Sequence, residues 1–212
     1  MAATEYDYRG LPRDPNPLGE LSAIDKGSPM NETPSEDAYG RVTNPARFAS
    51  LHDAADRIVE ELTDRFEVEV LDVEVDWWMS STWNASHAIR LTPTGGGASA
   101  TVVWTSFPGV GLVVGHASRF TFPACGCDAC DEDPGDEAER LRRTIGAVTS
   151  GGFSETRKRR HVGRDVYRTD LRHNDGSEQW GLGEIDEYAG ARVPQGTTTW
   201  PRWIRRGVAS RA

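Results

Sequence analysis

The sequence predicts an α+β fold: an antiparallel β-sheet of meander and hairpin strands with two main helices packed on it. Two segments repeat apolar residues every three or four positions, the period of a helix with one buried face. Short β-branched stretches, separated by glycine-rich turns, lie between and after these segments, and this pattern is typical of antiparallel strands. Helices that cover one face of such a sheet make an α+β domain.

The first predicted helix runs from Pro45 to Phe66. Asn44 is a favoured N-cap residue, and proline suits the first helical position. The apolar positions that follow have helical spacing: Phe48, Leu51, Ala54, Ala55, Ile58, Val59 and Leu62. His52 and Asp56 lie one turn apart, and we expect them to form an ordinary surface pair.

The second predicted helix runs from Pro134 to Ser150. Asp133 is the expected N-cap, and the acidic residues of the first turn favour the positive end of the helix dipole. Leu141, Ile145 and Val148 make the apolar stripe, and Gly151-Gly152 ends the helix.

Between these helices four strands are predicted: Val68–Val75 with a slip near Leu71, His87–Leu91, Ala100–Thr105 and Gly111–Phe122. Beyond the second helix the chain is expected to be extended from Phe153. A hairpin is then predicted around Asn174-Asp175-Gly176, with the strands Val166–Leu171 and Ser177–Leu182. The last stretch is expected to be irregular and pinned to the body by Trp200 and Trp203.

Composition divides the chain into two parts. Residues 1–37 are acidic and rich in proline, and a segment with so few apolar residues does not offset its ordering entropy, so we expect a disordered tail. Residues 38–212 are expected to form a single α+β domain. The sequence has no apolar run long enough to span a membrane and no secretory signal pattern at its start, so a cytoplasmic location is expected.

All three cysteines fall within Cys125-Gly126-Cys127-Asp128-Ala129-Cys130. Thiolates are preferred zinc ligands, and a two-residue separation is common between paired ligands. The pattern therefore predicts one metal site, with Zn²⁺ the expected ion, on Cys125, Cys127 and Cys130. His116 is the nearest candidate for the fourth ligand; the other candidates are His52, His87, His161, His173, Asp128 and a water.

Two other interpretations of the cysteines stay open at this point. A redox function is suggested by the Cys127-x-x-Cys130 spacing just before a helix N-terminus, although the flanking acidic residues would raise thiol pKa values. The third interpretation is that the thiols are buried structural groups that bind nothing.

The segment from Arg157 to Arg172 is the strongest basic run, and phosphate contacts are one interpretation of it. The chain as a whole carries a formal charge of −9. The favoured interpretation of the basic run is therefore a solvated strand face, or a patch whose charge complements that of the acidic half of the chain. Nucleic acid and membrane are therefore not the expected partners.

Several stretches resemble an uncharacterised actinobacterial family of unknown function that carries an FPxCGCDACD signature. The similarity lies in Tyr39–His52, in Phe122–Asp131 with the cysteines, and in Gly151–Phe153 and Asp175–Ser177. It covers roughly residues 37–185 and implies no activity, substrate or fold.

The function expected from the sequence is a non-catalytic cytosolic interaction module, with another protein as its partner, whose cysteine loop is stabilised by a metal. The alternatives are a thiol-based redox protein or enzyme that uses these cysteines, and nucleic-acid binding through Arg157–Arg172. The sequence neither indicates nor excludes an enzyme.

Overall fold

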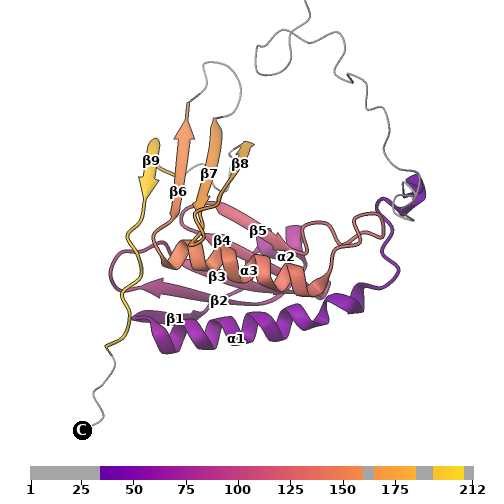
Figure 1. Cartoon of the computed structure of the whole chain (residues 1–212), viewed down its shortest axis with the longest axis horizontal. Helices are drawn as coiled ribbons and strands as arrows, with labels where there is room; N and C mark the ends of the chain where they lie inside the picture. The colour runs from indigo at the N-terminus through magenta and orange to yellow at the C-terminus, as the bar shows by residue number, and fades with distance from the viewer. Residues whose placement is uncertain (1–33, 160–164, 185–192, 208–212) are drawn as a thin grey trace, which may run out of the picture. The chain divides into compact units, whose positions relative to one another are not determined.

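The structure is a computed structural model that describes residues 34–159, 165–184 and 193–207 (Figure 1). The tail expected over residues 1–37 lies outside the described residues up to residue 33. From Ser35 onward the chain forms one unit. This unit opens with two short 3₁₀ turns, η1 (Glu36–Ala38) and η2 (Pro45–Ala49).

The strands form two antiparallel sheets. The first follows chain order: β1 (Val68–Asp72), β2 (Ala85–Pro93), β3 (Ala100–Thr105), β4 (Val110–Val114) and β5 (Ser118–Phe122). The second has the order β8-β7-β6-β9: β6 (Phe153–Lys158), β7 (Val166–Arg172), β8 (Glu178–Glu184) and β9 (Gly196–Thr199). The predicted meander and the predicted 174–176 hairpin are both confirmed, since neighbouring strands are joined by short turns.

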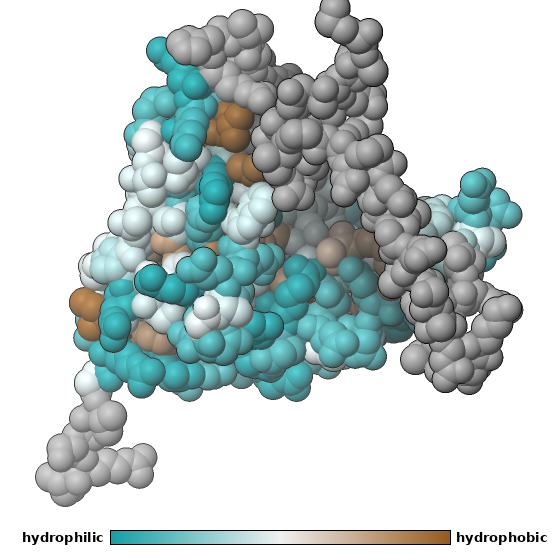
Figure 2. All heavy atoms as spheres, turned by 45° about the horizontal axis from the view of Figure 1, so that its top comes forward, coloured by the Kyte–Doolittle hydropathy of each residue, from teal (hydrophilic) through white to brown (hydrophobic). Residues whose placement is uncertain are grey.

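The two main helices, α1 (Ser50–Arg65) and α3 (Pro134–Thr149), lie side by side on one face of the first sheet (Figure 1). Their apolar stripes, including Leu51 and Leu141, join Leu91 and Leu112 of the sheet in the main core. The face of the molecule drawn in Figure 2 is mostly hydrophilic, with small apolar patches. This distribution is the one that amphipathic helices produce when they bury a single stripe.

The helix starts follow the predicted positions with one difference in detail. The Asp133 carboxylate accepts hydrogen bonds from the backbone N–H groups of Gly135 and Asp136, at 2.7 and 3.1 Å, so the predicted N-cap of α3 is confirmed. The Asn44 side chain makes no such capping bond, and Pro45–Ala49 forms a 3₁₀ turn before α1 begins at Ser50.

Two predicted strands differ from the structure. Gly111–Phe122 is two strands, β4 and β5, because the chain reverses at Gly115 in the left-handed region (φ +62°). The first strand ends at Asp72, and a short helix that the sequence reading missed, α2 (Trp77–Trp83), follows it. Asp76 caps this helix by accepting a hydrogen bond from the Met79 N–H. Met79 packs on the opposite face of the sheet from the main core, against Ala88 and Val103.

A buried carboxylate joins the two sheets. Glu155 of β6 is 1% exposed. Its carboxylate accepts hydrogen bonds at 2.9–3.0 Å from the backbone N–H groups of His116 and Ala117 in the β4–β5 turn and of Ser118, the first residue of β5. It also accepts bonds from the hydroxyls of Ser118 and Tyr167. These donors satisfy a charge that would otherwise be costly to bury.

The last described stretch is pinned as the sequence predicts, but the expectation that it is irregular is wrong for Gly196–Thr199, which forms β9 beside β6. The Trp203 ring is buried against Phe66 in an edge-to-face contact, and its indole N–H donates to the Ala98 carbonyl at 3.0 Å. Trp200 stacks on Phe153 with ring centroids 5.1 Å apart. Within the described ranges, no helix combines the length and the apolar character that crossing a membrane requires.

We expect Glu155→Gln to lower the free energy of unfolding on the order of 2–3 kcal/mol, because an amide turns one acceptor oxygen into a donor that faces a backbone N–H. Chemical denaturation measures the change. Glu60→Gln, on the exposed face of α1, is the control and should leave the stability unaltered. Equal stability of the two variants would show that the carboxylate does not hold the sheets together.

Candidate metal centre

The loop between β5 and α3 brings the three cysteines to one point. One ligand atom from each of Cys125, Cys127 and Cys130 lies within 4.8 Å of the other two. The Cys125 thiol donates to the Cys127 sulfur at 3.2 Å, and none of the three is in a disulfide. Cys127 is buried, whereas Cys125 and Cys130 are exposed. Three sulfurs this close can bind one soft or borderline cation.

Gly126 makes the tight path between the first two cysteines possible. Its φ is +81°, in the left-handed region that favours glycine, and a Cβ there would lie 3.0 Å from the Phe107 ring. A second left-handed residue, Asp131 (φ +44°), closes the loop, and its N–H donates to the Cys127 carbonyl at 3.2 Å. The loop therefore has a defined backbone conformation around the thiols.

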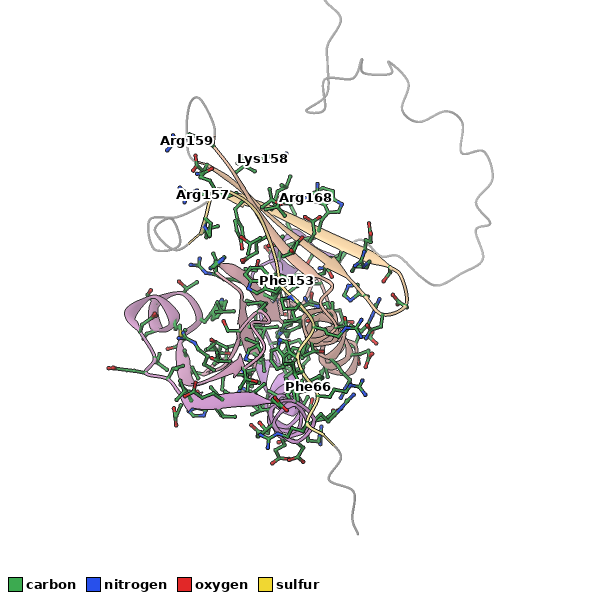
Figure 3. The ribbon with its side chains drawn as sticks, turned by 90° about the vertical axis from the view of Figure 1, so that its left-hand side faces the viewer. Phe66, Phe153, Arg157, Lys158, Arg159 and Arg168 are labelled. Atoms are coloured by element: carbon green, nitrogen blue, oxygen red, sulfur yellow. The ribbon has the colours of Figure 1, made fainter. Side chains whose placement is uncertain are left out.

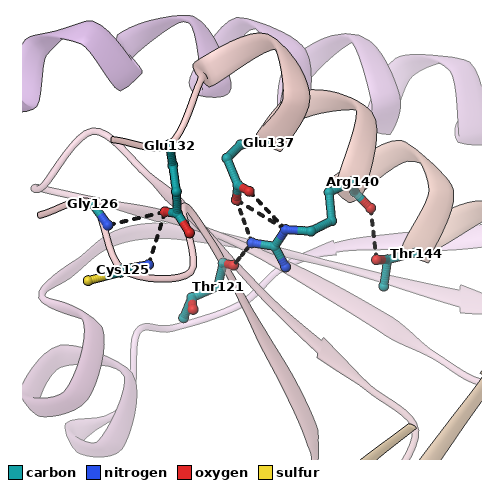
Figure 4. Close-up of polar contacts among 7 residues, drawn as sticks. All are labelled: Thr121, Cys125, Gly126, Glu132, Glu137, Arg140 and Thr144. Atoms are coloured by element: carbon teal, nitrogen blue, oxygen red, sulfur yellow. Dashed lines mark hydrogen bonds and ion pairs between the residues drawn. The ribbon is translucent and has the colours of Figure 1, made fainter. Parts of the chain in front are cut away.

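Glu132, near the end of the loop, forms hydrogen bonds with the backbone near its start. One of its carboxylate oxygens accepts hydrogen bonds from the N–H groups of Cys125 and Gly126, at 3.1 and 3.2 Å, while the Cys125 sulfur points away from it (Figure 4). Beside it, Arg140 of α3 bonds to Glu137 and to the Thr121 carbonyl of β5. The Glu132 bonds thus close the loop on itself, and Arg140 joins the helix after the loop to the strand before it.

The same loop is hydrogen-bonded to the segment that precedes η2. The N–H groups of Asp128 and Ala129 donate to the carbonyls of Arg41 and Ala38, at 2.8 and 3.3 Å. The Asp128 carboxylate in turn accepts bonds from the Thr43 N–H at 2.9 Å, from the Thr43 hydroxyl and from Arg41. The sequence analysis considered Asp128 as one of the flanking negative charges and as a candidate fourth ligand, whereas in the structure its carboxylate is bonded to Thr43 and Arg41. Its partners are 85 and 87 residues away, so no local pattern could have pointed to them.

The hydrogen bonds of the loop change its acid–base properties. The pKa of Cys127 is lowered to about 6, chiefly by the hydrogen bond from the Cys125 thiol and then by the backbone N–H groups of Cys130 and Gly40. The pKa of Cys130 is raised to about 12, first by its hydrogen bond with the Cys127 sulfur. Hydrogen bonds led by the Thr43 N–H lower the pKa of Asp128. Cys127 is thus the thiol best prepared to bind as a thiolate.

His116 does not join the cysteines. It lies in the β4–β5 turn, where its ring packs on Trp200 with centroids 5.2 Å apart. The whole of β5 separates it from the loop, and a five-residue strand spans about 13 Å. The sequence analysis chose His116 because it lies close to Cys125 along the chain, but the residues between them include the extended strand β5, so His116 and the loop lie at opposite ends of that strand.

The other described histidines are engaged elsewhere. His52 does not pair with Asp56 as expected; its Nε2 donates to the Gly109 carbonyl at 3.0 Å. His87 lies against Trp104 with its Nδ1 3.7 Å from Asp72, and the His173 ring nitrogen donates to the Arg143 carbonyl at 3.3 Å. His161 lies outside the described residues.

Of the basic residues in the Arg157–Arg172 segment, Arg157 and Lys158 lie on β6, Arg159 directly follows it, and Arg168 lies on β7 (Figure 3). Arg157 pairs with Asp165 at 2.8 Å and Arg168 pairs with Asp170. Residues 160–164 of the segment lie outside the described residues. Neighbouring carboxylates therefore neutralise two of its arginines, which favours the interpretation as a solvated strand face.

These features define an α+β domain with a three-cysteine loop. The loop connects β5 to α3 and is hydrogen-bonded to the segment before η2. The chain belongs to a family of unknown function (DUF6226), which matches residues 19–207. The match extends beyond the roughly 37–185 suggested by the resemblance, at both ends. Neither the curated proteins nor the solved structures include a significant match.

We expect Asp128→Ala to release residues 36–43 from the loop, because it removes acceptors for Thr43 and Arg41 together. The measurements are hydrogen exchange at the Thr43 amide and the rate of tryptic cleavage after Arg41, both of which should increase. Asp56→Ala on the exposed face of α1 is the matched control. Unchanged exchange at Thr43 would contradict this account of the bonds between the loop and that segment.

Proposed function

We propose that this chain is a non-catalytic cytosolic interaction module whose Cys125, Cys127 and Cys130 bind one Zn²⁺ ion, and that its partner is another protein. The convergence of the three sulfurs within 4.8 Å carries the proposal. Zinc is the expected ion because it takes thiolates readily and has no redox chemistry of its own.

The metal would serve to hold the loop and the segment before η2 in place. Four acidic residues, Asp128, Asp131, Glu132 and Asp133, lie in or just after the cysteine loop, so the loop accumulates negative charge when its thiols ionise. A divalent cation offsets that charge, and its binding energy becomes folding energy for the segment it orders. Because the loop is bonded to Ala38, Arg41 and Thr43, the order would extend to residues 36–43.

The first test is the metal content of the purified protein by elemental mass spectrometry, which should give about one zinc per chain. Removal of the metal with a chelator should lower the melting temperature on the order of 5–10 °C, and added zinc should restore it. Protein that carries no zinc, and that melts at the same temperature with and without added zinc, would refute the proposal.

Cys127→Ser should abolish high-affinity zinc binding, because it removes the buried ligand. Ala129→Ser places the same hydroxyl two residues along the loop without removing a thiol and should bind zinc like the parent chain. Zinc titration of both variants against a metal indicator gives the comparison. Equal affinities would show that Cys127 is not a ligand.

A thiol-based redox function is the second candidate, favoured by the 3.2 Å Cys125–Cys127 contact and the lowered pKa of Cys127. In this function the Cys127 thiolate attacks a low-molecular-weight disulfide and releases one substrate thiolate, and a second cysteine then attacks the Cys127 sulfur of the mixed disulfide and releases the other. The protein gains one disulfide and the substrate is reduced to two thiols. Equilibration of the metal-free protein with a glutathione redox buffer, followed by mass spectrometry, tests it: metal-free protein whose three thiols stay fully reduced would reject it.

A further inference from the structure

We infer that a metal held by Cys125, Cys127 and Cys130 keeps its fourth coordination position open, toward a cleft with aromatic walls that binds a small neutral nitrogen heterocycle. This inference rests on the proposed metal site and specifies its ligand. Tetrahedral zinc with three protein ligands takes its fourth ligand from solution, whereas a closed structural site has four ligands from the protein.

The first support is that the described side chains able to supply a fourth ligand are already engaged. The four described histidines bind or pack elsewhere, as set out above. The carboxylates around the loop are engaged as well: Asp128 by Thr43 and Arg41, Asp131 by Arg47, Glu132 by two backbone N–H groups, and Asp133 by the start of α3. Recruiting any of these groups would break an existing bond.

The second support is a cleft beside the first cysteine. Cys125 lines a cleft of about 260 Å³ that also includes Trp83, Phe107 and the residues around the β3–β4 turn. The Trp83 ring lies directly on β4, where a Cβ at Gly111 would come within 2.5 Å of it. Glycine at this position therefore leaves room for the indole to form one wall. Thr82, Thr105 and Thr121 add hydroxyl-bearing side chains to the lining.

Charge and shape together select the ligand. A divalent ion with three thiolates carries a net charge of −1, and Glu132 lies next to it without a described cationic partner. A further anion is therefore disfavoured. A planar, uncharged ring with a nitrogen donor can bind the metal and pack between aromatic side chains. Imidazole is the simplest molecule of this class.

Cobalt(II) is the probe, because its visible spectrum reports both thiolate ligation and the identity of the fourth ligand. We expect cobalt-loaded protein to show thiolate-to-metal charge transfer and a saturable change in its d–d bands on addition of 1-methylimidazole. Acetate, an anion without a ring, should produce no such change. Metal content is counted after the titration, so that loss of the ion is distinguished from ligand binding.

Trp83→Leu keeps an apolar side chain in the wall but removes the aromatic face, so 1-methylimidazole should bind about three- to tenfold more weakly. Trp180→Leu, at an exposed position on β8, is the matched control and should leave the affinity unchanged. A cobalt spectrum with charge transfer that 1-methylimidazole does not alter would overturn the open position while leaving the metal site intact. Failure to bind cobalt at all would reject the proposed metal site itself. Equal weakening in both tryptophan variants would remove the aromatic cleft from the proposal.

Discussion

The arrangement of this domain depends on one buried carboxylate. Glu155 belongs to the second sheet, yet its carboxylate binds three successive backbone N–H groups at the turn of the first sheet. A charge with 1% exposure is tolerated only because every bond it needs is supplied by that turn and by two hydroxyls. Gly115 permits the approach, since a Cβ there would lie 2.7 Å from the carboxylate. The turn, the docking of the sheets and the position of β5 are therefore linked.

The cysteine loop follows from that arrangement, because β5 and α3 hold its two ends. Within the loop, most of the carboxylates already accept hydrogen bonds from protein groups. The three sulfurs are the remaining groups that can bind a cation. Such a loop has two opposing tendencies: its bonds to residues 38–43 favour order, and its negative charges repel one another. The pKa of Cys127 is lowered because hydrogen bonds are donated to its sulfur, and the pKa of Cys130 is raised first because of its hydrogen bonds with the Cys127 and Cys125 sulfurs.

Local signals accounted for most of the secondary structure. Asp133 and Pro134 predicted the start of α3 because a cap acts on N–H groups within three residues of it. Asn174-Asp175-Gly176 predicted its hairpin because the residues of a tight turn themselves specify the reversal of the chain. The short helix α2 was missed because seven residues carry too few helical periods to stand out beside three tryptophans. The division of the strands into two sheets was also missed, since pairing depends on partners far along the chain.

The sequence by itself determined the two main helices, most of the antiparallel strands and the three-cysteine segment, because each is specified by residues within a few positions of one another. Only the tertiary structure decided which distant groups meet. It placed His116 at the far end of β5, brought Arg41 and Thr43 to Asp128, and set Trp83 and Phe107 beside Cys125. The reason is physical: a strand reversal or the docking of a segment moves a side chain by more than ten ångströms, whereas a metal ligand or a hydrogen bond requires contact within about 3 Å.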